Sequence, residues 1–149
     1  MTRFENEFAM REQAKAFLLE RGFLPVVEFW LAGYGPADVV GGKFGPRTGR
    51  RVPDLLEVVA IELKLDDVAG VVAQAVRNRV HADWSFAAMP AERVAKMRPT
   101  TLELFTINQI GLLAFGERVV EIIAPIHNNS RRLFKSRQLW RRLKQAKSV

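Results

Sequence analysis

The 149-residue sequence contains no cysteine. Disulfides, thiolate metal sites and cysteine nucleophiles are therefore excluded, and any bound metal must have oxygen or nitrogen ligands. No apolar run approaches the roughly 18 residues that span a bilayer, and the amino-terminal stretch MTRFENEFAMRE lacks the apolar segment of a signal peptide. We therefore expect a cytoplasmic protein with no membrane partner.

Acidic residues are missing from the carboxy-terminal part of the chain, because none follows Glu121. The 23 lysines and arginines include eight between positions 131 and 147, and the remainder nearly balance the 16 acidic residues. The charge pattern is thus a near-neutral body with a cationic tail, which suits a polyanion such as nucleic acid.

The apolar content of 48% is enough for a sizeable core. We therefore expect one domain over residues 1 to 149. Residues 2 to 22 are predicted to be helical, because Thr2 and Glu5 have the spacing of a capping box and Gly22 supplies a stop. Residues 23 to 31, 38 to 44 and 56 to 65 are predicted strands of an antiparallel meander.

The second half of the chain alternates helical and strand patterns. Residues 67 to 81 have helical spacing and 84 to 89 form an apolar strand, which predicts parallel pairing with strand 56 to 65. The remaining predictions are short helices at 91 to 97 and 102 to 110, a hairpin of 111 to 115 with 119 to 123, and a helix at 131 to 147 with a stripe of Leu133, Leu139, Trp140, Leu143 and Ala146.

An acid and a base, Glu62 and Lys64, interrupt the apolar strand 56 to 65. Because side chains alternate along a strand, both share one face with Val58 and Ala60. The strand is apolar on both faces, so it should be central, where a charged pair is costly without partners or a metal. The plainer alternative is an ion pair at the exposed end of the strand, and the acid-x-Lys pattern is frequent by chance.

Two aspartates compete to complete a site with Glu62. Asp54 precedes it in the same strand region, about 26 Å away at 3.3 Å per residue, which is too far to share one ion. Asp38 lies on the preceding strand, and a hairpin centred on Arg50 pairs residues whose numbers sum to 100, with Cα atoms roughly 5 Å apart. We therefore predict that Asp38 and Glu62 converge on one hard cation, and that Asp54 belongs to the turn.

Three segments carry a family resemblance: ADVVGG with Asp38, VVAIELKL with Glu62 to Lys64, and VVAQAVRNRVHADWSFAAMP. Together they resemble the PD-(D/E)xK nuclease superfamily over residues 4 to 90. The resemblance implies an α/β, restriction-endonuclease-like fold with an α-β-β-β-α-β core and a mixed sheet. Residues 91 to 149 would add a C-terminal β-hairpin and a basic helix.

The resemblance also implies individual roles. The Mg²⁺ (or Mn²⁺) ligands would be Asp38, Glu62, the carbonyl of Leu63 and, as in some members, Glu7. Lys64 would orient the attacking water and stabilise developing charge on the phosphorus centre, while Gln74 matches a glutamine of the following helix. Independently of the family, carboxylates and waters suit Mg²⁺. The expected function is metal-dependent hydrolysis of DNA phosphodiester bonds.

Other residues are interpreted as structural. His81 and His127 lack a zinc partner pattern, Asn78 fits an ordinary exposed polar residue, and Trp30 and Trp84 fit the core. Asp66 and Asp67 most simply cap the helix that follows.

The basic helix admits three interpretations: phosphate contact, a solvated charged face over a packed stripe, or contact with an anionic membrane or another subunit. Trp140 favours docking on the body or on a second subunit, so a homodimer is compatible with the sequence. Phosphate contact would involve Arg131, Arg132, Lys135, Arg137, Arg141, Arg142 and Lys144. The rival functions are a non-catalytic nucleic-acid-binding module and a structural subunit of a phage or mobile-element assembly.

Overall fold

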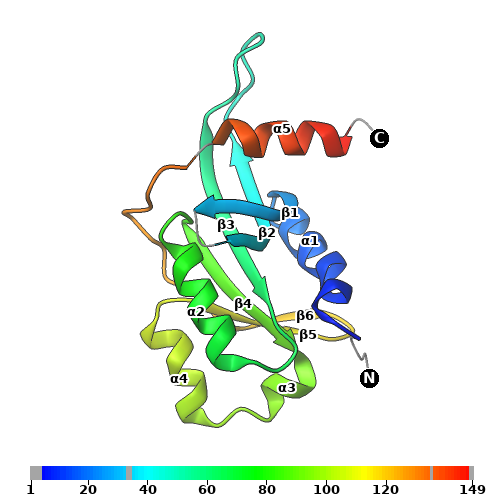
Figure 1. Ribbon diagram of the computed structural model, residues 1–149, viewed down its shortest axis with the longest axis vertical. Helices are drawn as coiled ribbons and strands as arrows, with labels where there is room; N and C mark the ends of the chain where they lie inside the picture. Colours follow the sequence, from blue (N-terminus) through cyan, green and yellow to red (C-terminus); the bar gives the residue numbers. More distant parts are fainter. Residues whose placement is uncertain (1–4, 33–34, 135, 148–149) are drawn as a thin grey trace.

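The computed structural model describes residues 5–32, 35–134 and 136–147 (Figure 1). Within them, six strands form one mixed sheet in sequential order: β1 (Leu24–Ala32), β2 (Gly35–Phe44), β3 (Leu55–Leu63), β4 (Trp84–Pro90), β5 (Gly111–Phe115) and β6 (Val119–Ile123). The helices are a 3-10 turn, η1 (Glu7–Met10), followed by α1 (Arg11–Glu20), α2 (Val68–Arg79), α3 (Ala91–Ala95), α4 (Pro99–Ile107) and α5 (Ser136–Lys147).

The strand pairing follows the predicted topology. β1, β2 and β3 are antiparallel neighbours, β3 pairs with β4 and β4 with β5 in parallel, and β5 and β6 form an antiparallel hairpin. The mixed α/β class, the meander, the parallel crossover through α2 and the closing hairpin are therefore confirmed. Among the described residues, no helix is both long enough and apolar enough to traverse a lipid bilayer.

The register of the β2–β3 hairpin is the one predicted from Arg50. Val39 faces Ile61, and the pairing continues in step as far as Lys43 opposite Glu57. Each of these pairs sums to 100, so continuation by one residue puts Asp38 opposite Glu62. A register shift between Lys43 and Phe44 places Phe44 opposite Leu55, so the turn itself is not centred on Arg50, although the strands beyond the shift keep the predicted register.

The two faces of this hairpin are covered by different helices. Val39, Val59, Ile61 and Leu63 face the apolar side chains of α1, whereas Val40, Val58 and Ala60 belong to a cluster with β1 and with Leu139 and Leu143 of α5. Figure 1 shows α5 crossing the strands near the far end of the hairpin, while α2, α3 and α4 gather at the other end. Glu62 shares the face of Val58 and Ala60 because side chains alternate.

The amino-terminal helix starts later than predicted. Asn6 is the N-cap, and its side chain accepts a hydrogen bond from Ala9 N, so η1 and α1 begin after it. Thr2 lies outside the described residues. Gly22, in the left-handed region with φ of +83°, ends the helix as expected.

The carboxy-terminal helix also starts later than predicted, at Ser136 instead of residue 131. The chain before it is tied down by tertiary contacts, because Arg132 N donates to Val80 O at 2.7 Å. Leu133 is 86% exposed and does not belong to the apolar stripe. Leu139 and Leu143 are buried, and Trp140 packs edge-on against Phe44 with ring centroids 5.0 Å apart.

Two smaller predictions also need correction. Strand β3 ends at Leu63, two residues earlier than expected, so Lys64 follows the strand. Trp30 is 57% exposed and does not contribute to the core as predicted. It lies on β1, beside the surface of α5 that carries Arg141.

Candidate functional site

The Asp38 and Glu62 carboxyl groups meet where β2 and β3 pair. Asp38 N donates to Glu62 Oε1 at 3.3 Å, and Leu63 N donates to Asp38 Oδ2 at 2.8 Å. Each carboxyl group is therefore held by the backbone of the opposite strand. The hairpin register, set by a distant turn, thus fixes the relative position of two acids that lie far apart in the sequence.

Glu62 is only 2% exposed although it is ionisable. The pKa of Glu62 is raised to about 8, first by burial and then by the hydrogen bond and negative charge of the Asp38 carboxyl, against opposing hydrogen bonds from Asn78 and from the Asp38 backbone. Near neutral pH the folded protein therefore keeps Glu62 mostly protonated. A cation between the two carboxyl groups would favour the charged form of both.

A pocket of about 230 Å³ opens beside Glu62, between α2 and the adjacent ends of β1 and β2 at Leu31 and Gly35. Asn78 Nδ2 donates to Glu62 Oε1 at 2.9 Å, so the prediction that Asn78 is an ordinary exposed residue is wrong. Gln74, one helical turn earlier, also lines the pocket, and its Oε1 is buried without a hydrogen-bond partner in the described part of the chain. The spacing of one helical turn between Gln74 and Asn78 already indicated that both could face one site, although such exposed polar pairs are ordinary.

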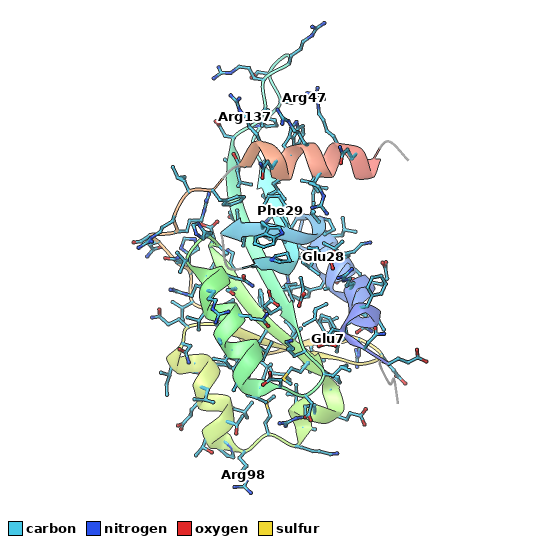
Figure 2. The ribbon with its side chains drawn as sticks, in the orientation of Figure 1. Glu7, Glu28, Phe29, Arg47, Arg98 and Arg137 are labelled. Atoms are coloured by element: carbon cyan, nitrogen blue, oxygen red, sulfur yellow. The ribbon has the colours of Figure 1, made fainter. Side chains whose placement is uncertain are left out.

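Lys64 and Glu7 form a second contact near the end of β3. Lys64 Nζ lies 3.8 Å from Glu7 Oε1, which brings the start of the amino-terminal helix to the strand end (Figure 2). Within residues 5–32, 35–134 and 136–147, no three acidic or histidine side chains gather as a metal cluster. Glu7 is thus placed beside Lys64 and is not grouped with Asp38 and Glu62.

The donors of this site fit a hard cation. Asp38 and Glu62 offer carboxylate oxygens, and Gln74 Oε1 is a buried acceptor in the pocket beside Glu62, with no hydrogen-bond donor among the described residues. Mg²⁺ uses one or two carboxylates and retains several waters. A complete cage of side chains is therefore not required for these residues to hold Mg²⁺ or Mn²⁺.

Asp54 takes no part in this constellation. It is exposed in the loop before β3, where its backbone carbonyl accepts a hydrogen bond from Gly45 N at 2.7 Å. The prediction that Asp54 belongs to the turn entering the third strand is confirmed.

A separate polar cluster surrounds Asp83, which sequence reasoning missed. Its carboxylate accepts a hydrogen bond from Val58 N at 2.7 Å and pairs with Arg131 Nε at 3.0 Å and His127 Nε2 at 3.3 Å. Arg131 has a side-chain exposure of 16%, so it anchors the segment between β6 and α5. A buried aspartate after a helix gives no sequence signal for such distant partners. His127 thus has a structural contact, in keeping with its predicted class.

The predicted phosphate-binding residues of the tail differ in their surroundings. Arg137 and Arg141 are exposed on α5. Arg142 Nη2 donates to Val27 O at 2.7 Å, and Lys144 lies over the Trp140 ring at 5.6 Å. Arg132 is exposed, and Lys135 lies outside the described residues. Arg137 and Arg141 are therefore better placed than Arg131 or Arg142 to meet a polyanion.

Comparison with known proteins supports the fold and assigns no activity. No protein-family model and no curated protein matches the chain. A solved structure, the SPO1766 protein of unknown function from Silicibacter pomeroyi, is similar with a TM-score of 0.61 and 18% sequence identity, covering 99% of this chain and 89% of that one. At this identity the likeness concerns the fold alone.

Proposed function

We propose that the chain is a metal-dependent nuclease that hydrolyses DNA phosphodiester bonds at Asp38 and Glu62. The supporting observation is the pairing of these two carboxyl groups across β2 and β3, with Glu62 almost fully buried. Burying an acid beside another acid is unfavourable, so such pairs are frequent at functional sites. The resemblance to the PD-(D/E)xK nucleases supplies the reaction class.

The residues of the site would have separate roles in metal binding and catalysis. Asp38, Glu62 and the Leu63 carbonyl would hold Mg²⁺, which when bound supplies Lewis acidity and charge neutralisation for phosphodiester hydrolysis. The Lys64 ammonium would orient the attacking water and stabilise negative charge that develops on the phosphate oxygens. Glu7, 3.8 Å from Lys64 Nζ, would help to hold that ammonium in place.

The α2 side chains would complete the pocket. Asn78 already donates to Glu62 Oε1 and fixes the orientation of this carboxyl group. Gln74 presents a buried Oε1 that can accept a hydrogen bond from a water in the pocket. The Gln74 amide would therefore position a water beside the carboxylates, which is a contribution of geometry and not of acid–base chemistry.

The experiment is cleavage of end-labelled linear duplex, four-way junction and single-stranded DNA with Mg²⁺, Mn²⁺, Ca²⁺ or excess chelator. Cleavage should need Mg²⁺ or Mn²⁺, while Ca²⁺ should bind without supporting turnover, because it has looser geometry and activates water less well. Direct titration with Mn²⁺, followed by its paramagnetic resonance, should show a site that Glu62→Gln removes. Equal cleavage in chelator, or Mn²⁺ binding that ignores Glu62→Gln, overturns the proposal.

A further inference from the structure

The loop between β2 and β3 carries a concentration of positive charge that the candidate active site does not use. Residues 45 to 54 read GPRTGRRVPD, and the side chains of Arg47, Arg50 and Arg51 are exposed there. No ion pair or hydrogen bond engages these three guanidinium groups within the described residues. Asp54 is the one acid of the loop, so the tip carries a net positive charge.

The loop is held as a projecting arm. Gly45 N donates to Asp54 O at 2.7 Å across its base, and Arg51 N donates to Thr48 O at 3.3 Å around its turn. Gly49 takes the left-handed conformation with φ of +60° that this turn needs. Figure 1 shows the arm extending past α5 at one end of the molecule.

Helix α5 packs against the base of the arm and adds positive charge beside it. A Cβ on Gly42 would lie 3.1 Å from Leu139 Cδ2, so the Leu139 side chain packs closely over the backbone of the strand. A groove of about 510 Å³ between the arm and the start of α5 is lined by Arg50, Arg51 and Arg137. Figure 2 shows Arg47 and Arg137 at this same end of the molecule. The arm and α5 therefore form one basic surface, which we call the basic end.

We propose that the arm enters the major groove of duplex DNA while α5 follows the flanking phosphates. The arm is a loop without strand structure of its own, carried on the two paired strands β2 and β3. The major groove admits an element as wide as a two-stranded β-ribbon, and arginine binds both phosphates and guanine edges with two hydrogen bonds. The arm contains no aromatic residue for stacking unpaired bases and no exposed large hydrophobic residue for a membrane interface. Duplex DNA is thus the polyanion that matches its chemistry.

The arm also sets a distance along the DNA. Glu62 and Arg50 are separated by twelve residues of β3 and loop, which span at most about 40 Å at 3.3 Å per residue. With one phosphate per strand every 3.4 Å, the arm would contact DNA up to about 12 base pairs from the cleaved bond. The inference that the partner is DNA rests on the proposed nuclease function. The test of the arm measures binding and does not require cleavage.

The test compares two variants of equal charge change in the full chain. Arg47→Gln/Arg50→Gln/Arg51→Gln removes the charge of the arm, and Lys96→Gln/Arg98→Gln/Arg118→Gln removes three exposed charges elsewhere, with Arg98 at the opposite end of the molecule (Figure 2). Binding to a 30-base-pair duplex and to a single strand of equal length is measured in chelator by fluorescence anisotropy over a salt series.

The arm variant should bind the duplex at least tenfold more weakly at low salt, and its slope of log K against log salt should be shallower by roughly 2 to 3. The control variant should change the slope by less than one, and single-strand binding should respond much less to the arm. An unchanged duplex slope in the arm variant overturns the proposal even if the protein cleaves DNA. Conversely, an arm-dependent slope in a protein that never cleaves supports the arm and overturns the nuclease function.

Binding to anionic vesicles tests whether the arm contacts a membrane instead of DNA. Vesicles of phosphatidylserine and phosphatidylcholine should show no binding that depends on the arm. If they do, while duplex binding is the same in both variants, the arm contacts a membrane and the duplex proposal is overturned.

Discussion

The two ends of the β2–β3 hairpin differ in the sign and in the burial of their ionisable side chains. At the Asp38–Glu62 end two carboxyl groups, one buried and one partly buried, are held by backbone hydrogen bonds. At the basic end the arginines are exposed, and solvent surrounds them. Chemistry on a phosphodiester needs fixed, desolvated groups, whereas binding to a polyanion uses solvated cations that displace counterions. One hairpin can therefore carry both tasks because it separates them along its length.

Substitution of the charged residues at the acidic end should have a large effect on cleavage and little effect on DNA binding. Asp38→Asn, Glu62→Gln and Lys64→Ala should each lower the cleavage rate by more than about a hundredfold, the scale on which single electrostatic or acid–base groups act. Duplex binding in chelator should remain within about threefold of the wild type, because the basic end supplies it. The measurement is single-turnover cleavage at saturating DNA.

Asp54→Asn is the matched control for these variants, since Asp54 is exposed in the loop and contributes its backbone carbonyl to the local hydrogen bond. Cleavage should be unchanged. If Asp54→Asn stops cleavage while Asp38→Asn does not, the assignment of the acids is wrong.

The acidic end was more predictable from sequence than the rest of the molecule. Alternation along β3 and antiparallel pairing of the hairpin depend on local geometry, so they placed Asp38 near Glu62 correctly, whereas the register shift between Lys43 and Phe44 was not predicted. The start of α5 depends instead on contacts of residues 131 and 132 with Asp83 and Val80, which are distant in sequence. Helical propensity continued through these positions, but tertiary contacts overrode it.

A second prediction concerns pH and the buried acid. The pKa of Glu62 is about 8 in the folded protein, against 4.5 for an unperturbed glutamate, so the folded state holds more protons than the unfolded state between these values. The free energy of unfolding of the metal-free protein should therefore fall as pH rises from about 4.5 to about 8. The loss is up to about 5 kcal/mol at 1.36 kcal/mol per pKa unit.

Urea unfolding in chelator across this pH range measures the effect, and Glu62→Gln should remove most of the slope. Added Mn²⁺ should reverse this decrease of the unfolding free energy with pH, because the cation must displace the proton and binds more tightly as pH rises toward 8. If the free energy of unfolding depends on pH in the same way in the wild type and in the Glu62→Gln variant, the pKa of Glu62 is not raised in the folded protein.

A third prediction separates the two kinds of arginine in the carboxy-terminal segment. Arg131→Gln should lower the free energy of unfolding by about 1 to 3 kcal/mol, because it leaves the Asp83 carboxylate with one partner fewer in a nearly buried site. The salt slope of duplex binding should not change. Arg137→Gln is the control with the reverse expectation, an altered slope and an unchanged unfolding midpoint.

The smallest effect expected lies on α5 itself. Arg137→Gln/Arg141→Gln removes two exposed charges and keeps helix propensity, since glutamine is a good helix former. If both contact phosphates, the slope of log K against log salt should be shallower by up to about 1.8. Arg142→Gln should instead leave the slope nearly unchanged and lower the thermal midpoint, because Arg142 donates to Val27 O and ties α5 to β1. An unchanged slope in the double variant would assign the exposed face of α5 to solvent and leave the arm as the DNA contact of the basic end.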